Sequence, residues 1–283
     1  MRLAGAVTRG SGAINEDGLG HIETDGSIAA AWIFDGVTGI NDRNYLPGGS
    51  DAAWLVTRAD AHLRDLALTV PDLVTVLDHL VERLIGDWAE ASSRLDLPAD
   101  YDPPAACLII ARRDAAGWTA LRLGDSCLLA RGRDGGHQLF AASPNNTFDH
   151  WLAAEARKRR DDGLLDVKAL LAEFRPQLLA SRARRNTADG YSVLEANRRA
   201  TLMPELITLG WPQQILLCTD GFYRAVDHYA LYDDADLLSA CSDTGGVDRV
   251  LSRIRGIEAD DPLCQHYIRF KPGDDATALM LSV

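Results

Sequence analysis

The feature that most constrains the fold is an unbroken apolar run, residues 28–34, which ends abruptly in Asp35 and Gly36. A run of this length bounded by Gly26 and Gly36 predicts a strand that is buried on both faces. The carboxylate of Asp35 would then lie at the end of a buried strand, where its ionisation is costly unless a positive charge compensates it. A glycine directly after the acid lets backbone, water or a ligand approach closely. This stretch predicts a buried acidic site, for which metal ions are the simplest compensating charge.

The composition is that of a globular protein and not of a disordered chain, with 47% hydrophobic and 25% charged residues among 283. The length is at the upper end of what one core can serve, so by length alone one domain with an insertion is as plausible as two domains. From the whole pattern we expect one domain over residues 1–283. The 41 acidic residues outnumber the 29 basic ones, and the net charge of -12 would repel nucleic acid and anionic membranes. We therefore expect neither of them as a partner.

Two further features bear on location. The first residues lack the apolar core and cleavage site of a signal peptide, and no run approaches the roughly 20 apolar residues of a membrane span. The five cysteines are scattered, odd in number and mostly embedded in apolar runs, which predicts reduced thiols in the core. We expect a cytoplasmic monomer.

Strand patterns open the chain, and helical patterns follow them. Residues 1–39 predict strands with tight connections, and Ser50 is the predicted N-cap of a helix that runs to Leu66. A second helix is predicted to begin at Thr69, with Pro71 in its first turn. Two consecutive amphipathic helices would then cover one face of a sheet.

Strand patterns return at residues 105–111 and 118–130. The second is interrupted by the Gly-Asp-Ser sequence of residues 124–126, which indicates a bulge or a place where a ligand meets the backbone. A later apolar run, residues 214–218, is followed by Asp220-Gly221 and so repeats the design of the opening stretch. Helices are predicted at 234–240 and 247–257. A final strand is predicted within residues 273–283, and acidic residues stand at its start.

Residues 144–205 break the strand rhythm with helix-like, highly charged sequence. We interpret this segment as a flap insertion within the domain and not as a second independent domain. Its two basic clusters, residues 157–160 and 182–185, are most simply solvated helix faces. The alternative is that they dock an anionic substrate beside an acidic site.

Five aspartates stand at the end or bend of an apolar strand or in an early turn, namely Asp17, Asp35, Asp125, Asp220 and Asp274. Each taken singly could be a turn or a cap residue. Together, with no histidine or cysteine beside them, they describe an all-oxygen site for hard divalent ions such as Mg²⁺ or Mn²⁺. A zinc site would be expected to recruit histidine or cysteine.

These acids lie in five short motifs that resemble, in order, the acidic motifs of the metal-dependent type 2C serine/threonine protein phosphatases. No single motif is specific, but five in the family's order make a strong signal, and the likeness is to a divergent bacterial-type member. The resemblance implies an α+β fold, a four-layer α-β-β-α sandwich of two antiparallel sheets flanked by helices, with a helical flap at 144–205. The motifs are residues 15–18, 34–39, 123–126, 218–222 and 273–277.

The resemblance also implies the roles of the catalytic acids, Asp35, Asp220 and Asp274. Asp35 would bridge two metals, Gly36 would offer its carbonyl, and Asp220 and Asp274 would hold one metal. A hydroxide shared by two Mg²⁺ or Mn²⁺ ions would attack the phosphorus, and no phosphoenzyme need form.

Two more acids complete the metal set that the resemblance implies. Asp17 would act through water, and Asp125 would help to hold a third, weaker ion. The cofactors are therefore two or three Mg²⁺ or Mn²⁺ ions, and the implied set is Asp17, Asp35, Gly36, Asp125, Asp220 and Asp274.

The chain departs from the family in its phosphate-binding and proton-donating positions. Gly12 stands where the family usually has a phosphate-binding arginine, and Arg9, nearby but out of register, is the candidate substrate-binding residue. Val37 stands where many members have a histidine proposed to protonate the leaving group. A bidentate guanidinium is among the strongest phosphate anchors, so its loss would weaken transition-state binding unless another group substitutes.

Two functions follow from the resemblance. The favoured one is a phosphoserine and phosphothreonine phosphatase in signalling, whose substrate is a protein phosphorylated in a serine/threonine kinase pathway. The alternative is a catalytically weak, phosphatase-like regulatory or protein-binding module, which the missing arginine favours. The intact acid set argues against the alternative, because clustered carboxylates repel one another unless they serve metals.

Overall fold

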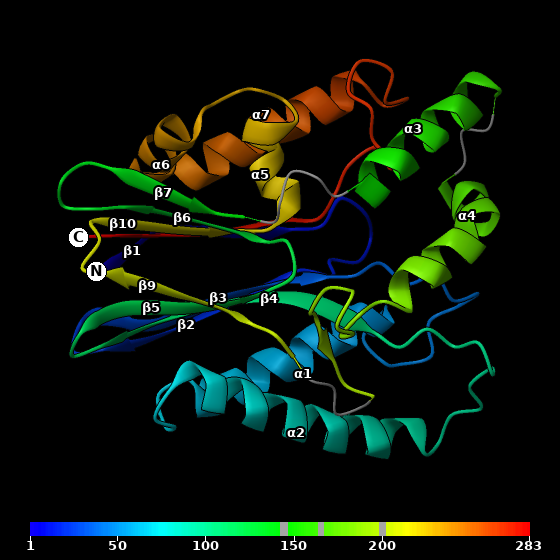
Figure 1. Ribbon diagram of the computed structural model, residues 1–283. Helices are drawn as coiled ribbons and strands as arrows, with labels where there is room; N and C mark the ends of the chain where they lie inside the picture. The colour runs from blue at the N-terminus through cyan, green and yellow to red at the C-terminus, as the bar shows by residue number, and fades with distance from the viewer. Residues whose placement is uncertain (142–146, 164–166, 198–201) are drawn as a thin grey trace.

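The computed structural model describes residues 1–141, 147–163, 167–197 and 202–283. Two antiparallel sheets lie face to face, and helices cover the outer face of each one (Figure 1). The predicted α-β-β-α sandwich is therefore confirmed. The described helices are α1 (Asp51–Leu66), α2 (Leu73–Ser92), α3 (Thr147–Asp161), α4 (Val167–Arg182), α5 (Asp220–Asp227), α6 (Asp234–Ser242) and α7 (Gly246–Asp260).

The two sheets differ in their strands and in the helices that cover them. The first sheet has the order β1 (Arg2–Arg9), β11 (Ala276–Ser282), β10 (Gln214–Cys218), β6 (Cys127–Arg131) and β7 (His137–Phe140). The second has the order β2 (Gly18–Thr24), β3 (Ser27–Gly36), β4 (Ala105–Asp114), β5 (Gly117–Leu123) and β9 (Glu205–Gly210), with β8 (Leu194–Glu195) also paired to β4. Helices α5, α6 and α7 cover the first sheet, and α1 and α2 cover the second (Figure 1).

Strand β3 is buried on both faces, as its apolar run predicts. Side chains alternate along a strand, so Ala31 and Ile33 pack between the two sheets, while Trp32 and Phe34 pack toward α1 and α2. All four side chains are fully buried. This double burial explains the absence of polar residues from the run.

The interruption at residues 124–126 is where the chain passes from one sheet to the other. Strand β5 belongs to the second sheet and β6 to the first, so the predicted single strand at 118–130 is two strands. Gly124 has a φ of 84°, and a Cβ there would come within 2.2 Å of Cys107 Sγ. The glycine therefore permits a turn that carries Asp125 from one sheet to the next.

Two helix predictions need correction. The second helix does not start at Thr69, because Asp72 is its N-cap, accepting a hydrogen bond from the Thr75 backbone N–H at 2.8 Å. Pro71 therefore precedes the helix and does not lie in its first turn. Helix α5 was not predicted. The aromatic residues Phe222 and Tyr223 follow Asp220-Gly221 and make the sequence resemble a continuing strand, but the structure changes from strand to helix at Asp220.

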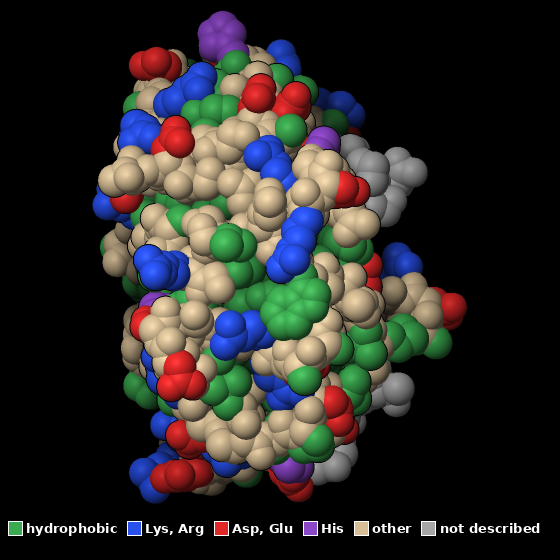
Figure 2. All heavy atoms as spheres, turned by 90° about the vertical axis from the view of Figure 1, so that its left-hand side faces the viewer, with side chains coloured by type: hydrophobic (Ala, Val, Ile, Leu, Met, Phe, Trp, Pro, Cys, Tyr) green, Lys and Arg blue, Asp and Glu red, His purple; other side chains and the backbone are tan. Residues whose placement is uncertain are grey.

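The sandwich has two different ends. Strands β3, β10 and β1 finish, and β2, β6 and β11 begin, at the end beside α3 and α4, whereas both termini lie at the other end (Figure 1). Figure 2 views the end with the termini, where basic and acidic side chains are intermixed around an apolar patch. Neither sign of charge dominates that face. All five predicted acids belong to the opposite end.

The segment 144–205 contains α3, α4 and β8, together with residues outside the described ones. Its division from the rest of the domain as a flap stays a prediction. None of the helices in the described ranges is long and apolar enough to cross a membrane. The five cysteines are buried and unpaired, as the sequence predicts.

Candidate active site

The five predicted aspartates gather at one end of the sandwich. Asp35 follows Ala31 and Ile33 on the face of β3 that points between the sheets. Four aspartates lie close enough for their negative charges to raise the pKa of Asp35, which burial raises first. These four, in order of decreasing effect, are Asp220, Asp17, Asp125 and Asp274.

Burial and mutual repulsion make this cluster costly to ionise. Both raise the pKa of Asp17 well above its usual range, and burial followed by the charge of Asp274 raises the pKa of Asp220 to about 7. The side chain of Asp220 is nevertheless 46% exposed, so solvent reaches the cluster at this residue. When ionised, the cluster would carry more negative charge than the neighbouring described residues neutralise, and bound cations would relieve that repulsion.

In the described part of the chain, Asp274 is the one acid of the five that two cations hold as an anion. Lys271 Nζ lies 2.5 Å from its Oδ1, and Arg224 Nη2 lies 2.7 Å from its Oδ2. Burial would raise the pKa of Asp274, but Lys271 and then Arg224 hold it below its ordinary value. Arg224 also lies 3.9 Å from Asp220 Oδ2, one helical turn away on α5.

Hydrogen bonds tie the two sheets together beneath the cluster. Asp17 Oδ2 accepts a hydrogen bond of 2.9 Å from Thr219 Oγ1, which joins the second sheet to the first. Asp275 accepts from the backbone N–H groups of Ser11 and Glu16, at 2.8 and 2.7 Å. These contacts fix the loop after β1 against the start of β11, so the acids come to rest in defined positions.

The glycines of the two Asp-Gly pairs are required by close backbone packing. A Cβ on Gly36 would lie 2.3 Å from the Glu16 carbonyl oxygen, and a Cβ on Gly221 would lie 2.0 Å from that of Asp275. Neither distance is compatible with a side chain unless the backbone moves. In each pair, the glycine lets a neighbouring acidic loop approach the carboxylate.

Asp125 lies at the sheet-to-sheet turn and contacts a thiol. Cys107 Sγ donates to Asp125 Oδ1 at 3.1 Å. Burial, and then the charge of Asp125, raise the pKa of Cys107 well above its usual range, so this thiol is protonated and acts as a donor.

The donor set fits hard divalent ions in its chemistry. It offers carboxylate oxygens, and its sulfur neighbour, Cys107, is a protonated thiol and not a thiolate ligand. In the described part of the chain, however, no three histidine, cysteine, aspartate or glutamate side chains already converge as a preformed metal site. Asp274 would have to exchange at least one of its two cations to serve as a ligand.

Arg9 ends β1 at the same end of the sandwich, opposite Ala276 of β11. Its side chain is exposed, and its backbone carbonyl accepts from Arg255 at 3.0 Å. Its role in binding substrate stays a prediction.

The basic clusters of the predicted flap are not simply solvated. Arg182 and Arg185 are buried and both form ion pairs with Asp102, and Arg182 also donates to the Thr38 carbonyl. Arg185 pairs with Glu195 as well, at 3.1 Å. The prediction of a solvated face at 182–185 is therefore wrong for these two arginines, because buried carboxylates compensate their charge.

In the cluster at 157–160, the two ends behave differently. Arg157 and Lys158 are exposed, as predicted. Arg160 instead donates from α3 to the backbone carbonyls of Arg269 and Phe270. Helix α3 is thereby attached to the loop that carries Lys271.

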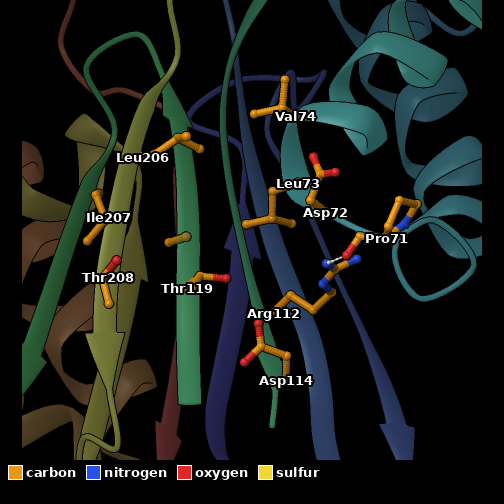
Figure 3. Close-up of a pocket in the computed structure, with 11 residues that line it drawn as sticks. Pro71, Asp72, Leu73, Val74, Arg112, Asp114, Thr119, Leu206, Ile207 and Thr208 are labelled. Carbon is orange, nitrogen blue, oxygen red and sulfur yellow. Dashed lines mark hydrogen bonds between the residues drawn. The ribbon is translucent and has the colours of Figure 1, made fainter. Parts of the chain in front are cut away.

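A cavity of about 260 Å³ lies elsewhere, between the start of α2 and strands β4, β5 and β9 (Figure 3). Its one arginine, Arg112, donates to the carbonyls of Ala67, Val70 and Pro71 at 2.5–3.3 Å. This guanidinium therefore ties down the connection between α1 and α2. None of the five acids lines the cavity, so it is separate from the candidate active site.

Sequence reasoning missed the two cations of the site. Arg224 stands four residues after Asp220, a spacing that would have placed both on one face if the helix had been predicted. Lys271 stands three residues before Asp274 in a loop, where no periodicity indicates the direction of a side chain.

Two comparisons of sequence bear on this site. The model of the protein family described as Protein phosphatase 2C matches residues 4–254. No curated protein matches the chain. The matched span includes Asp17, Asp35, Asp125 and Asp220.

Solved bacterial phosphatases share the fold at low sequence identity. The serine/threonine phosphatase PstP/Ppp of Mycobacterium tuberculosis is 17% identical with a TM-score of 0.53, and the match covers 99% of this chain and 97% of that chain. Serine/threonine phosphatase Stp1 from Staphylococcus aureus is 13% identical with a TM-score of 0.54, covering 100% and 97%. The catalytic domain of PstP in complex with two manganese ions is 17% identical with a TM-score of 0.54, covering 98% and 95%. At these identities the likeness concerns the fold.

Proposed function

The chain belongs to the protein phosphatase 2C family, and from that premise we propose that it is a metal-dependent phosphatase of phosphoserine and phosphothreonine in proteins. The observation that carries the proposal is the gathering of five aspartates, drawn from both sheets, at one end of the sandwich. A structural core gains nothing from such mutual repulsion, whereas a site for divalent cations requires it.

The residues that would hold the ions are those of the predicted set. Asp35 would serve both ions, Gly36 would offer its carbonyl, Asp220 and Asp274 would hold one ion, and Asp17 would act through water. Asp125 would contribute to a third, weaker position. The solved PstP domain with two manganese ions supports divalent ions as cofactors here. The chemistry that two such ions supply when bound is a water of lowered pKa as nucleophile and neutralisation of charge on the phosphoryl group.

The protein itself contributes position and charge. The Thr219 bond fixes the Asp17 carboxylate between the sheets, and Asp275 fixes the adjoining loop. Asp35 directly follows the buried residues 28–34 of β3, whose packing holds the strand in place. Carboxylates fixed in this way keep the charges of the site in place without reorganisation during the reaction.

The substrate and setting belong to the same proposal. Family membership supports a phosphoprotein from a serine/threonine kinase pathway as the substrate. Five buried, unpaired cysteines support a reducing compartment such as the cytoplasm. Arg9 is retained as a candidate contact for substrate at the rim of the site.

The test is hydrolysis of an aryl phosphate by the purified protein with Mn²⁺ or Mg²⁺, with and without a chelator. We expect turnover that requires metal and that falls by at least about 100-fold in Asp35→Asn and in Asp220→Asn, since each removes a charged ligand. Asp60→Asn, an aspartate of α1 paired with Arg64 outside the site, is the matched control and should keep wild-type turnover. Metal binding without turnover would instead support the regulatory module.

A further inference from the structure

We propose that Lys271 binds the phosphate of the substrate and so replaces the arginine whose place is taken by Gly12. Arg224 is the positioning residue of this arrangement, acting through Asp274. The inference rests on the proposed function, because it names the group that holds the phosphate at the same site.

Lys271 lies between the two acidic segments where a phosphate would have to bind. Its Nζ is 2.5 Å from Asp274 Oδ1 and 3.3 Å from Thr38 Oγ1, and Thr38 follows Asp35 by three residues. The ammonium group thus spans from the loop after β3 to the loop before β11. Its side chain is 28% exposed, so it can be reached from solvent.

The loop around Lys271 is held firmly enough to place its side chain. Arg269 is buried and donates to the Asp261 carboxylate at 3.1 Å and to the Pro272 carbonyl at 3.1 Å. Arg160 of α3 donates to the carbonyls of the two residues directly before Lys271. The backbone is therefore anchored on both sides of Lys271, while the four-carbon side chain remains able to change partners.

Arg224 is suited to a supporting role and not to direct phosphate binding. Its Nη2 holds Asp274 at 2.7 Å, and its Nη1 is buried, without a hydrogen-bond partner among the described residues. A guanidinium fixed in this way continues to neutralise Asp274 when Lys271 moves away. Asp274 can then release its Oδ1 partner without being left as an isolated buried charge.

The charge of the site favours this exchange. Five aspartates, Lys271 and Arg224 leave three negative charges when all are ionised, which two divalent cations would convert to one positive charge. Divalent cations at the site would repel the lysine and compete with it for Asp274, whereas a phosphate dianion would attract it. The ammonium group of Lys271 lies 2.5 Å from Asp274 Oδ1, so it is already beside the carboxylate for which the divalent cations would compete.

The test is direct binding of inorganic phosphate to the Mg²⁺-loaded protein by calorimetry, in wild type, Lys271→Met and Lys271→Arg. We expect the phosphate Kd to rise by about 10- to 100-fold in Lys271→Met, the scale of one charge-assisted hydrogen bond, and by only a few-fold in Lys271→Arg. Lys158→Met is the matched control, because it removes the same charge from an exposed lysine of α3 and should leave the Kd unchanged.

A second measurement separates phosphate binding from a structural role. Mn²⁺ binding in the absence of phosphate should be unchanged or tighter in Lys271→Met, since the variant removes a cation that competes for Asp274 Oδ1. Weaker Mn²⁺ binding in this variant, or a phosphate Kd equal to that of the wild type, would overturn the inference.

The two proposals can fail separately. A wild type that binds phosphate through Lys271 but hydrolyses no phosphomonoester would contradict the phosphatase function and leave the phosphate site standing. Turnover in the wild type with an unchanged phosphate Kd in Lys271→Met would contradict the phosphate site alone.

Discussion

At the scale of single residues, Asp274 and Asp220 show how position decides the charge of a carboxylate. Both lie in the same cluster, but Asp274 has a cation on each oxygen, whereas Asp220 has Arg224 only at 3.9 Å. The pKa of Asp274 is accordingly lowered and that of Asp220 raised. The metal-free site therefore combines one stabilised anion with several that are costly to ionise.

This difference predicts a pH dependence of stability in the metal-free protein. The pKa of Asp220 is about 7 when folded and near 3.8 when unfolded, so the folded chain holds its proton more tightly. The free energy of unfolding must then fall as pH rises from about 4 to about 7, with no further contribution from this group outside that window. Urea unfolding at a series of pH values with chelator should show a shallower fall in Asp220→Asn. Parallel curves for the two proteins would refute this account of Asp220.

The Asp-Gly pairs yield a second prediction at this scale. Gly36→Ala places a methyl group 2.3 Å from the Glu16 carbonyl, and we expect a loss of about 1–3 kcal/mol in the free energy of unfolding. Gly39→Ala is the control, because a Cβ there meets nothing within 4 Å and should change stability by less than about 0.5 kcal/mol. Chemical denaturation of both variants measures the difference. Equal stabilities would mean that the close approach is not required.

At the scale of elements, the ends of strands and the starts of helices position the chemistry. Strand β3 delivers Asp35, and the β10–α5 junction delivers Asp220 with Arg224 one turn later. Helix α4 contributes from outside the sheets, because Arg182 reaches both Asp102 and the carbonyl of Thr38. The loop after Asp35 is therefore fastened to α4 by a buried ion network.

Breaking that network should be costly. Asp102→Ala would leave the buried guanidinium of Arg182 without its carboxylate and Arg185 with one partner fewer, and we expect a loss of about 3–5 kcal/mol. Asp100→Ala is the matched control two residues away, since its pair with Arg175 is 66% exposed on the aspartate side and worth at most about 1 kcal/mol. Thermal or chemical unfolding compares the two. Similar losses would show that the buried network does not hold α4.

At the scale of the whole molecule, stacking two sheets brings acids from distant parts of the sequence to one end. Asp17 and Asp35 come from the second sheet, and Asp220 and Asp274 stand at the borders of strands of the first. The layers were predictable because long apolar runs identify buried strands and motif order identifies the family. Hydrophobic residues repeating every 3.6 positions likewise predicted α1, and apolar runs or alternation of period two predicted most of the strands.

The remaining features were not predictable from local patterns. The passage of residues 124–126 between sheets depends on which strands pair, and Lys271 acquires its position from contacts made by Arg269 and Arg160. Buried ion pairs such as Arg182 with Asp102 join residues 80 apart, and a charge cluster in sequence carries no sign of its burial. Tertiary contacts, and not propensity, decided these cases.

The central claim is that this molecule removes phosphate from phosphoserine and phosphothreonine with divalent metal. The most direct measurement is phosphate release from phosphoserine and phosphothreonine peptides by the wild-type protein, with Mn²⁺ and with chelator in its place. We predict release with Mn²⁺ that chelator abolishes and restored Mn²⁺ recovers. Release that is unaffected by chelator, or no release from a protein that demonstrably binds Mn²⁺, would contradict it.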